Sequence, residues 1–245
     1  MSARRPTLIV FCREPIPNHA KTRLIGKISA NAAAALADAF IHDALAKAIA
    51  IKPGRLVIAG SAPEAALRSK YFTNLAKRFG VELIDQGGGS LGMRMARALE
   101  RYAPDGALLI GADMPSLPAR LLKRSFDLLR ANRVVIAPSM DGGYYAVGVR
   151  GAIPPIFAGI RWGSGGVLAE TIARLENARV DFALGPAWYD IDRWSDVMLL
   201  GAHLRLMPRS SRLPCPQTVS VLKRLGVLRD DRYSTSTRAK RISDR

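Results

Sequence analysis

The stretch Gly106-Ala-Leu-Leu-Ile-Gly-Ala-Asp-Met-Pro115 decides the fold. Residues 106–112 are small or apolar and carry no charge, which is typical of a strand buried on both faces. The run then meets the carboxylate of Asp113 and the turn residue Pro115. We therefore predict a central strand over 106–112, with Asp113 at its carboxyl end.

Strands and helices alternate on both sides of this strand. Apolar runs predict further strands at 7–11, 55–59, 81–84, 133–137, 144–149 and 179–184. Helical patterns occur at 29–51, 64–79, 91–102, 116–131, 164–177 and 193–206, with Ser29, Ser90, Ser116 and Ser164 at helix starts. Alternation favours a three-layer α/β fold with a mainly parallel sheet, and the short turn before 144–149 suggests that this strand pairs antiparallel. Such sheets bind ligands beyond the carboxyl ends of their strands.

Length and charge suggest one domain followed by a basic extension. The chain has 245 residues, 49% of them hydrophobic, which suits one α/β domain over residues 1–207. Of the net charge of +17, residues 205–245 carry +8, from eleven Lys and Arg against three Asp. We expect residues 208–245 to be a basic, partly disordered tail, either simply solvated or in weak contact with polyanions such as nucleic acid or anionic lipid.

Cysteine and histidine usage excludes several classes of site. Cys12 and Cys215 are far apart and the three histidines are scattered, so neither a disulfide scaffold nor a zinc site is indicated. The apolar run Leu8–Cys12 is too short for a signal-peptide core or a membrane span. The expected protein is cytoplasmic, without a transmembrane segment.

Three carboxylates are candidate metal ligands. Asp113 follows the central strand, and Asp190 and Asp192 would face the same side of an extended segment. A divalent cation bound to phosphates needs only one or two protein carboxylates. The hypothesis is that these three hold Mg²⁺ or Mn²⁺ against a diphosphate and offset the charge of its leaving group. The alternative for Asp113 and Asp192 is helix capping.

Cations and glycines lie at other predicted strand ends. Arg13, Lys21 and Arg23 belong to the loop after the first strand, where they suit a phosphate chain or a base edge, although the loop lacks the Walker pattern. Gly88 and Arg94 belong to a Gly-rich turn entering a helix, a geometry that can accept an anion.

Two further segments are candidate borders of an acceptor site. The segment Asp141-Gly142-Gly143 is either a plain tight turn or a place where a ligand approaches the backbone, and Asp141 is a candidate catalytic residue together with Asp113. The Phe157 to Ser164 loop either lines an acceptor pocket or packs on the sheet.

Six motifs in a fixed order resemble the radical-SAM/selenodomain-associated transferases, a glycosyltransferase-A-like family of the nucleotide-diphospho-sugar transferase superfamily. They are Lys21-Thr-Arg-Leu24, Gln86 to Met95, Gly111-Ala-Asp-Met-Pro115, Asp141-Gly-Gly-Tyr144, Ile160-Arg-Trp-Gly-Ser164 and Asp190-Ile-Asp192. The resemblance covers about residues 7–206 and implies a transferase fold of the glycosyltransferase-A (GT-A) type, with Asp113 and the late Asp pair as Mg²⁺ or Mn²⁺ ligands. Two positions depart from the family pattern, since Asn18 replaces a glycine and Ser90 an acidic residue.

The function hypothesis is a metal-dependent transferase that uses a nucleotide-activated donor and a small-molecule acceptor. In it, Lys21 and Arg23 hold the nucleotide, the three carboxylates position the metal, and Asp141 to Tyr144 border the acceptor. Glycosyl transfer from a nucleotide sugar comes first. Two alternatives stay open: a guanylyltransferase-like nucleotidyltransferase that releases pyrophosphate, and a noncatalytic protein that binds polyanions through its tail.

Overall fold

The computed structural model describes residues 5–207 and 213–228. In these residues the strands are β1 (Thr7–Arg13), β2 (Arg55–Ser61), β3 (Glu82–Asp85), β4 (Ala107–Gly111), β5 (Val134–Pro138), β6 (Tyr144–Val149) and β7 (Phe182–Leu184). They form one sheet in the order β3-β2-β1-β4-β6-β5-β7. Only β6 runs antiparallel to its neighbours, β4 and β5. The predicted sheet type, its central strand and its antiparallel strand are confirmed.

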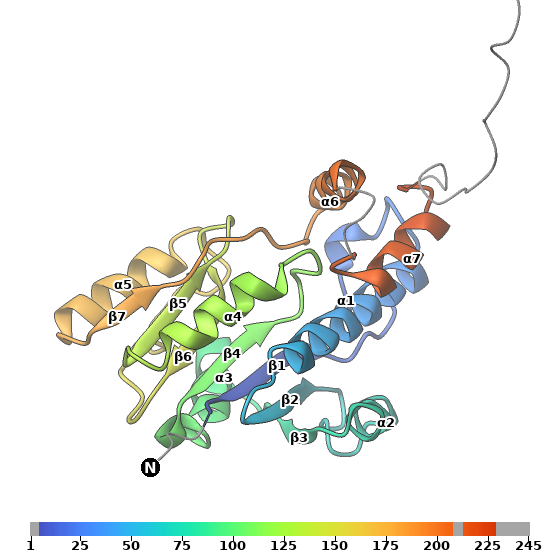
Figure 1. Cartoon of the computed structure of the whole chain (residues 1–245). Helices are drawn as coiled ribbons and strands as arrows, with labels where there is room; N and C mark the ends of the chain where they lie inside the picture. The colour runs from blue at the N-terminus through green and yellow to red at the C-terminus, as the bar shows by residue number, and fades with distance from the viewer. Residues whose placement is uncertain (1–4, 208–212, 229–245) are drawn as a thin grey trace, which may run out of the picture.

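Helices cover both faces of this sheet (Figure 1). In chain order the described helices are α1 (Ala30–Ala50), α2 (Lys70–Phe79), α3 (Leu91–Glu100), α4 (Ala119–Leu128), α5 (Val167–Asn177), α6 (Trp194–Leu206) and α7 (Pro216–Arg224), with short 3-10 turns η1 (Thr22–Leu24) and η2 (Ala103–Asp105). Side chains of α1, α2 and α4 pack on one face, and those of α3 and α5 on the other. The predicted three-layer α/β architecture is therefore confirmed.

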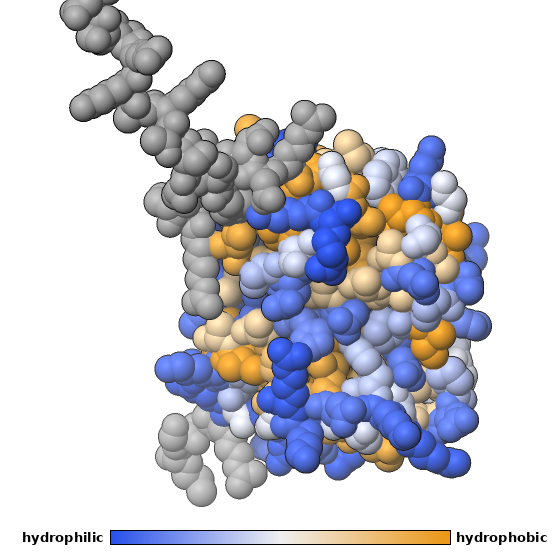
Figure 2. Space-filling view, turned by 90° about the vertical axis from the view of Figure 1, so that its right-hand side faces the viewer, coloured by the Kyte–Doolittle hydropathy of each residue, from blue (hydrophilic) through white to orange (hydrophobic). Residues whose placement is uncertain are grey.

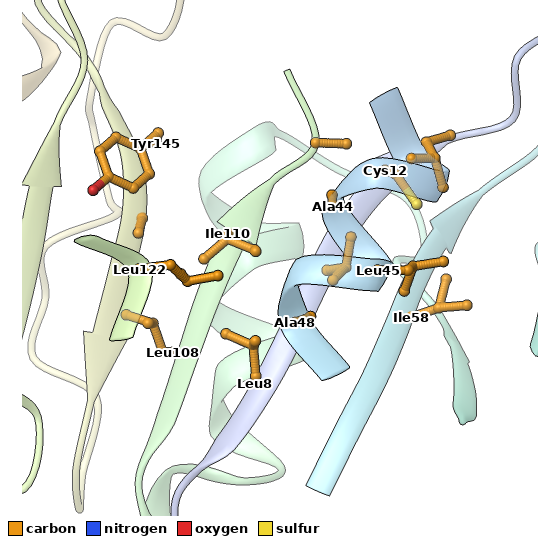
Figure 3. Packing of buried hydrophobic residues seen from close by; sticks show 14 of the residues in the cluster. Leu8, Cys12, Ala44, Leu45, Ala48, Ile58, Leu108, Ile110, Leu122 and Tyr145 are labelled. Carbon is orange, nitrogen blue, oxygen red and sulfur yellow. The ribbon is translucent and has the colours of Figure 1, made fainter. Parts of the chain in front are cut away.

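The alternation of side chains along β1 explains why both faces are covered. Leu8 and Val10 belong to the core under α1, whereas Ile9 between them belongs to the core under α3. Figure 3 shows Ala44 and Leu45 of α1 beside the strands. Truncating a fully buried leucine such as Leu45 to alanine typically lowers the free energy of unfolding by about 2–5 kcal/mol. The packing of α1 on the sheet therefore holds the strands firmly in place.

Helix α7 packs on the outer side of α1. Val219 and Leu222 are buried against the same cluster as Phe40 of α1. Asp43 of α1 accepts hydrogen bonds from the backbone N–H groups of Gln217 (3.1 Å) and Thr218 (2.8 Å), and so caps the first turn of α7. Part of the expected 208–245 tail thus belongs to the fold. Residues 208–212 and 229–245, and with them most of the tail's predicted polyanion contact, lie outside the described residues.

Two of the four expected serine caps are confirmed and two are wrong. Ser29 and Ser90 accept hydrogen bonds from the first turns of α1 and α3. Ser116 is not a cap: α4 begins after Pro118, and a residue that precedes proline disfavours the helical conformation. Two glycines after Ser164 delay the start of α5 to Val167.

The face of the molecule on the side of α2 and α7 is mixed in polarity. Figure 2 views the side on which α2 and α7 lie in Figure 1, and it shows hydrophilic side chains interrupting the apolar areas. No helix in residues 5–207 and 213–228 combines the length and apolar character required to cross a membrane.

Candidate functional site

Two cavities lie at the carboxyl ends of the central strands and share a wall. The first measures about 540 Å³ and holds most of the predicted cations. The second measures about 320 Å³ and lies on the side of β6. Phe11, Leu91, Asp113 and Asp192 line both. The two cavities therefore lie at the edge of the sheet where the sequence predicted ligands, with carboxylates between them.

The first cavity is basic. The cationic side chains lining it are Arg13, Lys21, Arg23 and Arg94. The only carboxylates among its lining residues are those of Asp113 and Asp192. Four cations that converge in this way suit a ligand with several negative charges, such as a nucleotide diphosphate.

Lys21 ties the first loop to two strand ends. Its backbone has left-handed dihedral angles (φ 48°, ψ 42°) just before η1. Its Nζ lies 2.8 Å from Oδ1 of Asp113 and 2.8 Å from Oδ1 of Asp192. It also donates to the carbonyl oxygen of Ile191 at 2.7 Å. Burial favours a lower pKa for Lys21, but the two carboxylates outweigh it and the pKa is raised.

Asp192 is held by cations and does not cap α6. Burial alone would raise its pKa, but Lys21 and Arg23 hold the pKa below its usual value. The Nη1 atom of Arg23 lies 3.1 Å from Oδ2 of Asp192, so both oxygens of the carboxylate are engaged. The N-cap of α6 is Arg193, and Asp196 accepts from its backbone N–H. The capping alternative for Asp192 is therefore wrong.

Asp190 is a partly buried carboxylate with other carboxylates nearby. It lines the second cavity with Asp113, Asp141 and Asp192. Burial, together with the charges of Asp141 and Asp192, raises the pKa of Asp190 to about 6. Within the described residues no group of three or more carboxylate, histidine or cysteine side chains is arranged to hold a metal ion. The three predicted ligands are brought to one cavity, but not into a three-ligand shell.

The turn between β5 and β6 presents Asp141 to the second cavity. Its Oδ1 accepts from the Oγ of Ser139 and from the backbone N–H of Gly143 at 3.0 Å. Gly142 has a φ of +87°, and a Cβ there would lie 2.0 Å from the carbonyl oxygen of Gly165. Gly143 lines the cavity, whereas Gly142 allows the backbone of the turn to approach the backbone of Gly165 closely.

Arg94 is directed by a buried glutamine. Gln86 donates through Nε2 to the carbonyl oxygens of Cys12 (2.9 Å) and Ala59 (2.8 Å), which joins the ends of β1 and β2. Its Oε1 accepts from Arg94 at 3.0 Å. The Nε of Arg94 is buried without a hydrogen-bond partner among the described residues, and burial followed by the charge of Arg13 lowers the Arg94 pKa. Because Arg94 also lines the first cavity, its guanidinium is suited to an anionic ligand there.

Gly88, predicted to contact the nucleotide, lines neither cavity. It stands in the turn between β3 and α3, where its carbonyl oxygen accepts from Arg97 at 3.2 Å. A Cβ at this position would meet no atom within 4 Å. The observed contact of Gly88 therefore supports the shape of the turn.

Lys47 is a residue of the site that sequence reasoning missed. It is only 8% exposed, and its Nζ donates to the carbonyl oxygens of Met114 (3.1 Å) and Pro115 (2.5 Å). These carbonyls directly follow Asp113, so the lysine fixes the loop that carries the central carboxylate. The available signal was the spacing of Asp43 and Lys47, two opposite charges four residues apart in an Ala-rich helix.

Replacing Lys47 with Met is expected to change the pH dependence of stability. Burial lowers the pKa of Lys47 to about 8, below its usual 10.5, so the unfolded chain binds more protons between these values. The free energy of unfolding of the wild type should therefore rise relative to Lys47→Met as pH increases from about 8 to about 10.5. Urea denaturation at pH 7, 9 and 10.5 measures this difference. A constant difference over the series would contradict it, and Lys123→Met on the exposed side of α4 is the control.

Comparison with known proteins gives one family match. The model of the family described as "Uncharacterized protein conserved in bacteria (DUF2064)" matches residues 43–164. This range includes Asp113 and the turn at Asp141, and excludes Lys21, Asp190 and Asp192. No curated protein sequence matches the chain.

Solved structures extend the likeness to most of the chain. A candidate nucleotide-diphospho-sugar transferase from Desulfovibrio desulfuricans G20 is 27% identical, with a TM-score of 0.76 over 90% of this chain and 96% of that one. A CMP-2-keto-3-deoxy-manno-octonic acid synthetase in complex with CTP is 12% identical, with a TM-score of 0.53 over 82% and 98% of the two chains. A nucleotidyl transferase from Methanothermobacter thermautotrophicus is 13% identical, with a TM-score of 0.54 over 81% and 97%. The last two share the fold alone.

These comparisons support the superfamily expected from the motifs, whereas the radical-SAM association stays a prediction. Over residues 43–164 the chain matches the DUF2064 family, and its fold is similar to those of nucleotide-diphospho-sugar transferases and nucleotidyltransferases.

Proposed function

We propose that this protein is a transferase that binds a nucleotide-activated donor in the first cavity and an acceptor in the second. One observation carries the proposal: a basic cavity and an acidic cavity share a wall that contains Asp113 and Asp192. A group that leaves a donor in one space can reach an acceptor in the other without crossing the sheet. The similar protein from Desulfovibrio desulfuricans G20, described as a candidate nucleotide-diphospho-sugar transferase, supports glycosyl transfer as the reaction.

The site chemistry fits a divalent cation held by few protein ligands. Lys21 and Arg23 already occupy Asp192, so the carboxylates suited to Mg²⁺ or Mn²⁺ are Asp113 and Asp190. Burial and the neighbouring carboxylates raise the pKa of Asp190 more than the charge of Lys21 lowers it, and a metal there would favour the ionised carboxylate. When bound with phosphate oxygens and water, such an ion stabilises the charge of a departing diphosphate.

The protein's own groups divide the remaining work. Arg13 and Arg94 supply donors for the donor's phosphates, while Lys21 holds Asp113 and Asp192 at a fixed separation. Oδ2 of Asp141, the oxygen that neither Ser139 nor Gly143 contacts, is the group that can accept a proton from an acceptor hydroxyl or amine. Asp141 is therefore the proposed general base.

Replacing Asp113 with Asn is expected to abolish metal-dependent donor binding. The test is a thermal-shift panel of UDP-, GDP- and dTDP-sugars and nucleoside triphosphates, each with and without Mg²⁺ or Mn²⁺. A ligand at a hundred times its Kd stabilises the folded state by about 2.7 kcal/mol. We expect at least one metal-dependent rise in Tm for the wild type and for the control Asp127→Asn, and none for Asp113→Asn.

The outcomes of this panel separate the candidate functions. Release of a nucleoside diphosphate from the stabilising sugar nucleotide identifies glycosyl transfer, and release of pyrophosphate from a triphosphate identifies nucleotidyl transfer, because the fold supports both chemistries. The absence of a shift with every nucleotide would refute the transferase. A chain that ends at residue 228 would then test the remaining alternative, polyanion binding by the terminal residues.

A further inference from the structure

We propose that the second cavity accepts a small molecule that carries no negative charge and presents a flat apolar face. This inference rests on the proposed function, because it takes the second cavity as the acceptor side. It is carried by the charges, the apolar lining and the aromatic wall of that cavity.

The charges of the second cavity exclude anions. Four carboxylates and no Lys or Arg side chain are among its lining residues. Lys21, from the neighbouring cavity, pairs with Asp113 and Asp192, Arg23 pairs with Asp192, and a metal would offset Asp190. Asp141 has only neutral donors, namely the hydroxyl of Ser139 and the N–H of Gly143. A phosphate or carboxylate placed here would face a negative charge that no Lys or Arg side chain lining this cavity offsets.

The deeper lining of the cavity is apolar. It includes Met95 of α3, Leu109 of β4 and Val147 of β6, whose buried side chains belong to one hydrophobic cluster. Such a surface offers no hydrogen bond to a polar ligand. Contact with an apolar ligand stabilises the complex, because it removes apolar surface of both partners from water.

Trp162 forms an aromatic wall in a fixed orientation. Its ring packs edge to face on Tyr144, with centroids 6.3 Å apart and an interplanar angle of 84°. It also stacks on Phe157 at 6.5 Å and 26°. Gly92 of α3 makes room for it, because a Cβ there would lie 2.8 Å from the indole ring and 2.6 Å from the carbonyl oxygen of Phe157. Because Tyr144, Phe157 and Gly92 already fix the Trp162 ring, a planar ligand can stack on it with little loss of side-chain entropy.

Size and functional group complete the description of the ligand. A volume of about 320 Å³ suits one small ring-bearing molecule. The free oxygen of Asp141 requires a donor, either a hydroxyl or an amine. The structure thus assigns to this cavity a neutral or cationic alcohol or amine with an aromatic or similarly flat body.

Three probes of one shape test this assignment. Tyrosol, tyramine and 4-hydroxyphenylacetate share a phenol ring and a two-carbon arm, and differ in the charge of the terminal group. Their dissociation constants for the full chain are measured by NMR titration of the Trp162 indole N–H, which Trp162→Phe identifies. We expect 4-hydroxyphenylacetate to bind at least about tenfold more weakly than tyrosol, and tyramine at least as tightly, as expected for one unit charge a few ångströms from a carboxylate.

Variants show whether the named residues cause this selectivity. Asp141→Asn and Asp190→Asn should each reduce the discrimination against the anionic probe, and Trp162→Ala should weaken all three probes. The use of two carboxylate variants keeps the test decisive if one fails to fold. Equal binding of the acid and the alcohol, no binding of any probe, or unchanged discrimination in both variants would overturn the assignment. The nucleotide panel reports on the first cavity, so a failure here is distinguishable from a failure of the transferase proposal.

Discussion

Lys21→Met is expected to lower the free energy of unfolding by about 2 kcal/mol, the range for hydrogen bonds to charged groups. The same change should weaken nucleotide binding about tenfold or more, because Lys21 both lines the first cavity and fixes two carboxylates. Fully buried ion pairs cost more to break, about 3–5 kcal/mol. Asp113 and Asp192 keep 50% and 35% of their side-chain surface exposed, so water compensates part of the loss.

The pH dependence of the Lys21→Met effect has a defined window. The pKa of Asp192 is lowered in the folded state, so its contribution to stability is present above its unfolded pKa and is lost as pH falls through the folded value. The pKa of Lys21 is raised, so its contribution is present below its unfolded pKa and is lost as pH rises through the folded value. Urea denaturation should therefore give a constant difference from the wild type between about pH 5 and 9, and a smaller one in acid.

Arg23→Met is the matched control for Lys21→Met. Arg23 contacts the same carboxylate, but its side chain is 61% exposed and its ion pair is of the surface kind. Such pairs contribute about 0–1 kcal/mol. Equal destabilisation by the two variants would mean that the bridge between Asp113 and Asp192 has no special role.

The fold could be predicted because its signals are local. The apolar run 106–112 became the central strand β4, the alternation of strands and helices predicted the layers, and the short turn before β6 predicted its antiparallel direction. Helix starts were less predictable. Ser116, expected as a cap, instead accepts a hydrogen bond from the indole of Trp188 at 3.1 Å, because Pro118 moves the start of α4 along the chain.

The grouping of site residues was predictable, whereas their pairing was not. Asp113, Asp190 and Asp192 do line one cavity, because Asp113 follows β4 and its carbonyl oxygen accepts from the N–H of Ile191 at 3.0 Å. No sequence pattern indicates that the Lys21 ammonium would lie between two of them, because residue 21 meets residue 192 only through tertiary packing. The same holds for Lys47, whose partners Met114 and Pro115 are 67 and 68 residues away.

The C-terminal segment shows how charge composition misleads. The count of basic residues after residue 205 predicted a tail, yet residues 213–228 include an apolar face that packs on α1. Val219 and Leu222 lie three positions apart, the spacing of one helical face. The buried Asp43 meets the start of this helix, which a composition average over the segment cannot reveal.

Gly142→Ala is expected to destabilise the protein by about 3 kcal/mol or more and to abolish probe binding in the second cavity, since such large values arise when backbone strain and a steric clash combine. The added Cβ would lie 2.0 Å from the carbonyl oxygen of Gly165, a backbone atom that a side-chain rotation cannot move. The carbonyl of Gly142 also accepts from the N–H of Leu168 at 2.9 Å, so a shift of this turn displaces the start of α5 together with the Trp162 loop.

Gly151→Ala is the control that separates the cost of the left-handed backbone from the cost of a steric clash. Gly151 has a similar φ of +79°, but a Cβ there would meet no atom within 4 Å, so the variant keeps only the left-handed backbone cost of about 1–2 kcal/mol. Urea denaturation of both variants, with tyrosol titration of each, gives the comparison. If the two variants lose equal stability and both still bind tyrosol, the contact between Gly142 and Gly165 does not shape the cavity. A larger loss confined to Gly142→Ala would mean that Gly142 is required because two backbone segments meet there. The turn would then shape the second cavity through its packing as much as through the carboxylate of Asp141.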